Sequence, residues 1–326
     1  MDKGQPQAQR RFVYGGQAVI EGVMIRGRDH YSLAVRKLNG EITTVSSRLS
    51  TLYTGRLRSI PLVRGVIVLL ETLIIGIQAL SRSANIALEE EGQELSGWSM
   101  AIMLTISLTL GIGLFFIAPL FAIRSLDSMI ESDALSNLLE GILRLAVFLA
   151  YILLIGLLPD IKRVFAYHGA EHMTVHAQEH ELPLEVENVR RFPTAHNRCG
   201  TAFLLVVMVV AIAVFTFIGR PSLPVSVASR IVLVPVIAAI SYEIIRFSGA
   251  HATNPLVKFI VYPSLALQSL TTRKPDDAQI EVAIRAMEHA IAVDQGIELP
   301  SDSQDADSEG MEASESEAEE DEPAPS

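Results

Sequence analysis

The sequence predicts an α-helical integral membrane protein with about four transmembrane helices, a small N-terminal β module and cytoplasmic amphipathic helices. The first observation is composition: 49% of the 326 residues are hydrophobic and 19% are charged, whereas soluble domains usually carry about 25% charged residues. The second is the run 101–123, which holds no charge and is long enough to cross about 30 Å of hydrocarbon. The third is the alternation of polar and apolar residues around Asn39-Gly40, which is typical of a β-hairpin.

The net charge of −11 comes from one end of the chain. Residues 298–326 contain 12 of the 37 acidic residues and no basic residue. The rest of the chain is nearly balanced, so the acidity gives no indication of a nucleic-acid partner. Cys199 is the single cysteine, which excludes an intramolecular disulfide bond.

The N-terminal part divides into three segments. We expect residues 1–11 to be disordered and residues 12–60 to form the β module, with Asn39-Gly40 supplying the positive φ angles of a two-residue hairpin turn. We expect interfacial helices over 61–92. The run 62–80 is apolar but contains Arg64 and Glu71, and charges are costly inside a bilayer. It therefore predicts an interfacial or partly buried helix rather than a span, and a second helix follows over 82–92.

The membrane domain is expected over residues 93–270. Its apolar runs predict four spans, at 101–123, 143–158, 202–218 and 231–245. Residues 256–270 are apolar but contain Lys258, Pro263 and Gln268, so we expect them to lie at the interface. A C-terminal helix over 271–296 is predicted, capped by Asp276 or Asp277, and residues 297–326 form an acidic, disordered tail.

Basic residues predict the orientation. The chain before the first span holds twelve Lys and Arg and the His-rich loop 159–201 holds five, whereas the loop 124–142 holds one. By the positive-inside rule both termini and the His-rich loop are cytoplasmic, in a bacterial inner membrane. The lipid bilayer is the expected partner, and a homo-oligomer or a membrane-protein partner is left open.

Histidines mark the candidate site. Five of the eight histidines lie within 29 residues, in YHGAEHMTVHAQEH and HNRCGT. On a helix, His168 and His172 stack on one face, and with Glu171 they have the H-x-x-E-H spacing of inverted zincins. In that arrangement two imidazoles bind zinc and the carboxylate takes the proton of a bound water. The pattern therefore predicts a divalent metal ion, best matched by zinc.

Two further residues complete the predicted metal shell. His196 and Cys199 are three residues apart and both types are good zinc ligands, whereas His176 and His180 are weaker candidates. A solvated amphipathic helix with histidines at the membrane surface, or an acid–base role without a metal, would also fit the pattern. Cys199 has two other interpretations: a nucleophile activated by His196 with Arg198 nearby, or a small residue packed at the start of the third span.

Three charged residues are candidates to contact the metal-binding side chains or the substrate without binding the metal themselves: Glu21, Glu243 and Arg198. Glu243 lies toward the inner end of the fourth expected span, where an ionisable residue indicates function. It would equally fit pairing with Arg246 or snorkelling at the interface. Glu21 would equally fit an acid on an edge strand.

Five segments resemble the bacterial YqhQ-like membrane proteins: YGGQAVIEGVMIRG, YHGAEHMTVHAQEH, LEVENVRRFPTAHNRCGTAFL, ISYEIIRFSG and LTTRKPDDAQIEVAI. The resemblance runs from about residue 12 to residue 292. This family is a domain of unknown function labelled a predicted metal-dependent enzyme, so the resemblance implies a membrane protein with a metal site but no particular reaction.

By position, the resemblance carries over to a set of polar residues: Glu21, His168, Glu171, His172, His196, Arg198, Cys199, Glu243, Asp276 and Asp277. This chain departs from the expected pattern at Met173, where a lysine is usual, and at Asn197, where a proline is usual. Neither change removes a candidate ligand. His176 and His180 lie outside the shared pattern.

The function we expect is that of a membrane-embedded, metal-dependent, hydrolase-like enzyme. His168 and His172 would bind the metal with His196 or Cys199, and Glu171 would be the general base. The alternative is a non-enzymatic scaffold or assembly factor with a structural metal site; a transporter is disfavoured by the few charges in the spans. An open coordination position would indicate the enzyme, and four protein ligands would indicate the scaffold.

Overall fold

The computed structural model describes residues 12–50, 55–88, 96–130, 132–196, 199–219, 221–251 and 254–297. Four strands come first: β1 (Gly15–Val19), β2 (Gly22–Arg26), β3 (His30–Arg36) and β4 (Ile42–Arg48). The helices up to the middle of the chain are η1 (Arg56–Ser59), α2 (Val63–Leu88), α3 (Gly97–Ile112), η3 (Gly113–Ile117), α4 (Ala118–Arg124), η4 (Asp127–Met129) and α5 (Asp133–Ile155). The remaining helices are α6 (Pro159–Glu179), α7 (Val186–Val189), α8 (Gly200–Ile218), α9 (Leu223–Val232), α10 (Val234–Ala250), α11 (Pro255–Thr271) and α12 (Asp277–Asp294).

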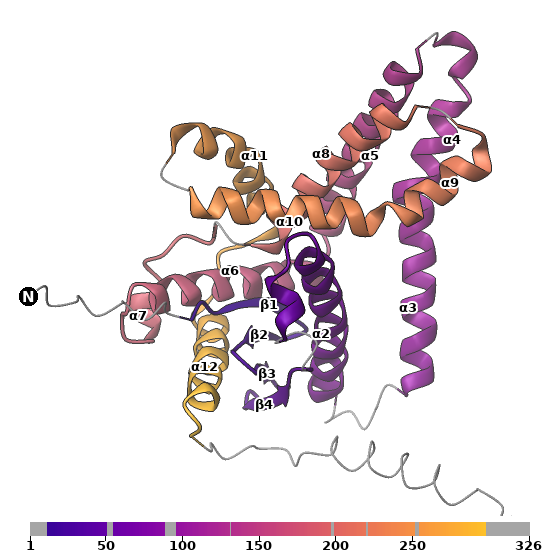
Figure 1. Cartoon of the computed structure of the whole chain (residues 1–326). Coiled ribbons are helices and arrows are strands. Elements are labelled where there is room, and N and C mark those ends of the chain that lie inside the picture. The colour runs from indigo at the N-terminus through magenta and orange to yellow at the C-terminus, as the bar shows by residue number, and fades with distance from the viewer. Residues whose placement is uncertain are drawn as a thin grey trace, which may run out of the picture.

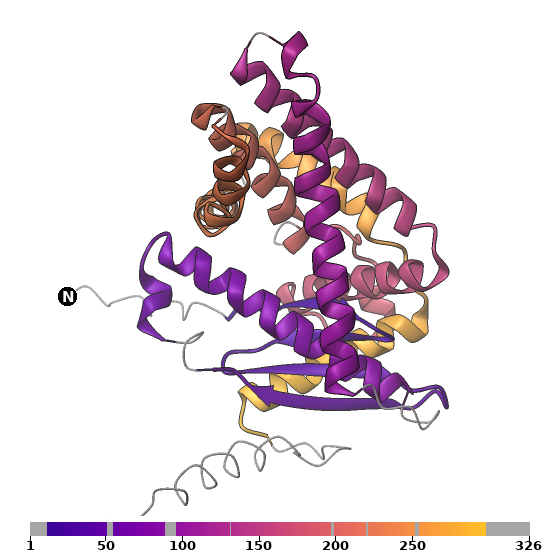
Figure 2. The same cartoon turned by 90° about the vertical axis from the view of Figure 1, so that its right-hand side faces the viewer.

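The β module is a four-stranded antiparallel sheet in the order β1-β2-β3-β4. Both of its faces are covered: α2 packs on one, and α12 with α6 packs on the other and along β1 (Figures 1 and 2). Successive side chains of a strand point to opposite faces, so Val23 and Ile25 pack against α6 and α12. Met24 between them packs against α2. This explains why β2 is apolar without alternation.

The hairpin predicted at Asn39-Gly40 is confirmed, but its turn differs from the two-residue type. Lys37 N–H donates to the Glu41 carbonyl at 2.8 Å, which leaves a loop of residues 38–40. Gly40 has a φ of 88°, and Asn39 does not have a positive φ. The side chain of Asn39 instead accepts from Glu41 N–H at 2.8 Å. A two-residue turn of this kind needs positive φ at both central residues, whereas a longer loop needs it only at the glycine.

Four helical segments are long and apolar enough to cross a membrane: Val63–Leu88, Gly97–Arg124, Asp133–Ile155 and Gly200–Ile218. A fifth arises if α9 and α10, which meet at a 44° bend, form one span. The expected spans 101–123, 143–158 and 202–218 correspond to three of the four segments. The expected span 231–245 falls in the bent pair instead, and α2 is the fourth segment.

The apolar run from Val63 and the expected second helix as far as Leu88 form one continuous helix, α2. Its two charges are paired within the protein. Glu71 is 3% exposed and binds Arg26 and Arg58, while Arg64 pairs with Glu243 on α10. The charges that argued against a span are therefore neutralised by partners that are distant in the sequence.

The C-terminal helix α12 is confirmed with Asp276 as its cap. The Asp276 carboxylate accepts from Gln279 N–H at 2.8 Å, and the Gln279 side chain accepts from Asp276 N–H at 3.0 Å. Ile280, Ile284 and Met287 are buried against the sheet, as their spacing predicts. Residues 1–11 and 298–326, for which the sequence predicts disorder, lie outside the described residues.

Candidate metal centre

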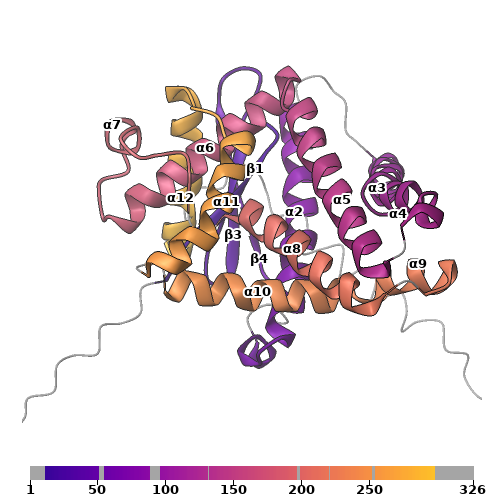
Figure 3. The same ribbon diagram turned by 90° about the horizontal axis from the view of Figure 1, so that it is seen from above.

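The helix α6 carries most of the candidate site and lies between the sheet and the apolar helices α8, α10 and α11 (Figures 1 and 3). It is continuous through Gly169, although glycine lowers helix propensity. A Cβ on Gly169 would lie 2.2 Å from the carbonyl oxygen of Arg273 and 3.1 Å from the Thr194 side chain. The glycine therefore lets two distant segments approach α6 at the point where the histidines lie.

Those two segments orient His168 and His172. The Nδ1 atom of His168 lies 2.9 Å from the Thr271 carbonyl oxygen, and that of His172 lies 2.6 Å from the Thr194 carbonyl oxygen. A carbonyl oxygen only accepts, so each Nδ1 carries the proton and each neutral ring keeps the lone pair on Nε2. A backbone carbonyl on the second ring nitrogen is the usual partner of a metal-binding histidine.

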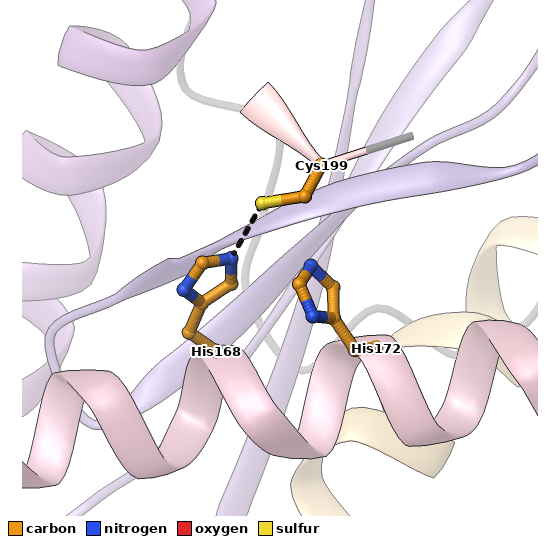
Figure 4. A group of neighbouring side chains, drawn as sticks. All are labelled: His168, His172 and Cys199. Carbon is orange, nitrogen blue, oxygen red and sulfur yellow. Dashed lines mark hydrogen bonds between the residues drawn. The ribbon is translucent and has the colours of Figure 1, made fainter. Parts of the chain in front are cut away.

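Cys199 completes a group of three metal-ligating side chains. His168 Nε2 lies 3.3 Å from Cys199 Sγ, and Figure 4 shows both imidazole rings rising from α6 on the side of the sulfur. One ligand atom from each of His168, His172 and Cys199 lies within 4.8 Å of the others. Two imidazole nitrogens and a sulfur are the donor set of zinc-type sites, so these residues fit a divalent metal ion.

Cys199 is fixed by its place at the start of α8. It is the N-cap residue, and its sulfur accepts from Thr201 N–H at 3.3 Å. His196 is held three residues earlier by Gln268 of α11, whose side chain accepts from His196 N–H at 2.8 Å and donates to its carbonyl oxygen at 2.9 Å. The candidate site therefore lies at the first residue of an apolar helix.

Glu171 is buried beside the first group. It is 4% exposed, and its Oε2 lies 3.5 Å from His172 Nε2. Burial raises the pKa of Glu171, while the nearby His168 and His196 oppose that rise. A carboxylate beside the ligating nitrogen, with a raised pKa, suits the uptake of a proton from a bound water.

The structure separates His196 from His168 and Cys199 and places it in a second group. One ligand atom from each of His176, Glu179 and His196 lies within 4.8 Å of the others. The ring centres of His176 and His196 are 4.5 Å apart, and those of His172 and His196 are 5.7 Å apart. The second group is thus adjacent to the first along α6.

The surroundings of this second group favour the neutral form of its two imidazole rings. Burial lowers the pKa of both His176 and His196, and the neutral imidazole is the form that binds a metal. His180 belongs to neither group: it caps α6, and its Nδ1 lies 2.8 Å from the His176 carbonyl oxygen.

The charged candidates make contacts away from the histidines. Glu21, with a φ of 51° in the turn between β1 and β2, pairs with Arg163 and accepts from the Tyr167 hydroxyl at 3.3 Å. Burial is the largest cause of the raised pKa of Tyr167. Glu243 pairs with Arg64 of α2. Arg198, together with Asn197, lies outside the described residues.

Sequence reasoning gave little weight to His176 and did not single out Glu179 as a ligand candidate. The signal was present, because His172, His176 and Glu179 follow one another at four and three residues, the spacing of one helix face. Gln268 had no such signal, since its role depends on α11 lying beside the loop that carries His196.

Comparison with known proteins identifies the family. The family model "Protein of unknown function (DUF1385)" matches residues 60–293. The chain is 33% identical over 297 residues to the uncharacterized protein YqhQ of Bacillus subtilis (strain 168), a match that covers 86% of this chain and 93% of the relative. No solved structure matches the chain. These matches confirm the resemblance seen in the motifs, and the chain belongs to the DUF1385 family of YqhQ-like proteins of unknown function.

Proposed function

We propose that this protein is an integral membrane, metal-dependent, hydrolase-like enzyme. The observation that carries the proposal is the group of His168, His172 and Cys199 with the buried carboxylate of Glu171 beside it. Three protein ligands leave one position of a tetrahedral zinc open, which is the pattern of catalytic rather than structural zinc sites.

Each residue of the first group has a role that follows from its contacts. His168 and His172 would hold a divalent ion through Nε2, because carbonyl oxygens accept their Nδ1 protons, and Cys199 would provide the sulfur ligand. Bound there, a divalent ion polarises a substrate carbonyl or phosphoryl group and makes a water more acidic. Glu171 would be the group that accepts a proton at this site, since its carboxylate is 3.5 Å from Nε2 of His172.

The membrane part of the proposal rests on the apolar helices. Four segments are long and apolar enough to cross a bilayer, and α3 has no buried residue along its length. With Gly97–Arg124, α5, α8 and the bent pair α9–α10 as the spans, the basic residues before residue 101 and in the loop 159–201 favour both termini and the site on the cytoplasmic side of a bacterial inner membrane. The substrate would then meet the site at the membrane surface, because Cys199 directly precedes α8.

A scaffold with a structural metal is the second candidate. The observation that favours it is that the site joins three segments, namely α6, the loop through Thr194 and the end of α11 at Thr271. An ion there would tie these segments together. This reading requires four protein ligands on one ion.

The test is the metal content of detergent-purified protein, measured by elemental mass spectrometry without chelators. We expect wild type to contain zinc or another divalent metal, and His172→Ala to lose the metal of the first group. His251→Ala is the control, because His251 is exposed at the end of α10. Glu171→Gln should keep the metal if Glu171 is a general base, whereas loss of the metal would make Glu171 a fourth protein ligand, as the scaffold requires. The absence of metal from wild type would contradict both.

A further inference from the structure

We propose that His176, Glu179 and His196 form a second divalent-cation site next to the first. The site is built from its own residues and does not depend on the proposed function. Its three ligand atoms meet the same distance condition as the first group, within 4.8 Å of one another.

Helix geometry accounts for the second group. His176 and Glu179 lie one turn beyond His172 on the face that carries the first group, because residues three and four apart are neighbours on a helix. His196 reaches this face from the loop that Gln268 clamps to α11 at both its N–H and its carbonyl oxygen. His196 on the clamped loop therefore faces His176 and Glu179 on α6. This arrangement is held in place before a cation binds.

The contacts of His176 favour metal binding. Its Nε2 lies 2.9 Å from the Ala195 carbonyl oxygen, which keeps a proton on that nitrogen in the neutral ring and leaves the lone pair on the other. His168 and His172 of the first group also contact a backbone carbonyl oxygen, but through Nδ1. The backbone of residues 194–195 thus orients one histidine of each group.

The contact of Glu179 with His196 has a separation that a shared cation fits. His196 Nε2 and Glu179 Oε2 are 3.5 Å apart, a distance within ion-pair range. A divalent ion at about 2.0–2.2 Å from each atom would bridge this separation. Glu179 is also partly exposed, so the second site faces solvent more than the first.

The experiment is a Co²⁺ titration of the full-length, detergent-purified protein after chelator treatment and dialysis. Absorption reports thiolate–cobalt bonding at Cys199, and elemental mass spectrometry reports the total metal. We expect wild type to bind about two equivalents of cation. Both His176→Ala and Glu179→Gln should lose about one equivalent and keep the thiolate–cobalt absorption. Glu179→Gln is the conservative variant, because it keeps the size of a partly exposed side chain.

The matched control is His180→Ala, one further turn along the same helix, which should still bind about two equivalents. Cys199→Ala should lose the thiolate–cobalt absorption and keep about one equivalent, which is removed by adding Glu179→Gln. Binding of one equivalent by wild type, unchanged in His176→Ala and Glu179→Gln, would overturn the second site and leave the first intact. Wild type that binds one equivalent without thiolate–cobalt absorption, and loses it in His176→Ala and Glu179→Gln, would count against the proposed function and support the second site.

Discussion

The α/β part and the apolar helices place their hydrophobic side chains in opposite ways. In the sheet, Val23, Leu33 and Val35 are fully buried between α2 on one face and α12 with α6 on the other. In α3 no residue is buried, and Leu108 and Leu110 are 61% and 67% exposed. The first part buries its apolar surface inside the protein. The second part leaves apolar surface exposed, as is typical of helices long and apolar enough to cross a bilayer.

Buried polar groups differ between the two parts as well. In the α/β part and at its edge, buried histidines such as His172 bond to backbone carbonyl oxygens. Among the apolar helices, Glu140 of α5 binds Arg144 of the same helix and Arg230 of α9. The closest distance is 2.7 Å to each. Both guanidinium groups also lie near the ring of Phe215. The apolar helices therefore contain a buried cluster of one carboxylate and two guanidinium groups.

The largest effect is expected from removing the shared negative charge. Glu140→Gln leaves Arg144 and Arg230 buried without their counter-charge, which should lower the free energy of unfolding by about 3–5 kcal/mol. The measurement is thermal unfolding in detergent. The control is Glu281→Gln, because Glu281 pairs with Arg36 on the surface of the α/β part and should change stability by less than about 1 kcal/mol. Equal effects of the two variants would contradict the contrast.

Two exposed leucines separate a lipid-facing surface from a water-facing one. Leu108 on α3 and Leu38 in the β3–β4 loop have similar exposed fractions, 61% and 65%. Leu108→Arg should oppose membrane insertion by about 2.5–3.5 kcal/mol, and Leu38→Arg should stay within about 0.5 kcal/mol of wild type. The measurement is the membrane-integrated fraction after carbonate extraction, with unfolding to compare stability. Normal integration of Leu108→Arg would show that α3 is not in the bilayer.

A methyl group at the joint between the two parts should have an intermediate effect. In Gly169→Ala the new Cβ would lie 2.2 Å from the Arg273 carbonyl oxygen, so the segment that follows α11 must move. We expect a loss of about 1–3 kcal/mol in stability, with weaker metal binding because the Thr271 carbonyl moves with it. Gly249→Ala is the control, since nothing lies within 4 Å of that position. Unchanged stability of Gly169→Ala would mean that this close approach is not required.

The smallest effect is expected at the cap of α12. Asp276→Ala removes the side-chain acceptor of the capping box and should lower stability by about 1 kcal/mol. Asp277→Ala, which loses only its ion pair with Arg190 on the surface, should have a smaller effect. The two are compared by chemical denaturation in detergent. A larger loss of stability in Asp277→Ala than in Asp276→Ala would contradict the assignment of Asp276 as the cap.

The features that follow from local spacing were predictable from the sequence. The run without charges at 101–123 predicts a helix that could span a membrane, and α3 to α4 form one such segment. Asp276 and Asp277 followed by apolar residues at helical spacing predict α12, and only the structure shows that Asp276 is the cap. His168 and His172 share a helix face because covalent geometry places residues four apart above one another.

Tertiary packing decided which residues act together. Arg64 and Glu71 looked unsuited to an apolar helix until distant partners, Glu243, Arg26 and Arg58, neutralised them. Likewise, the spacing of His196 and Cys199 suggested a single site. In the structure a ligand atom of His196 groups with those of His176 and Glu179, and that of Cys199 groups with those of His168 and His172. Such choices depend on segments separated by tens of residues, whose approach is fixed by close packing and not by local periodicity.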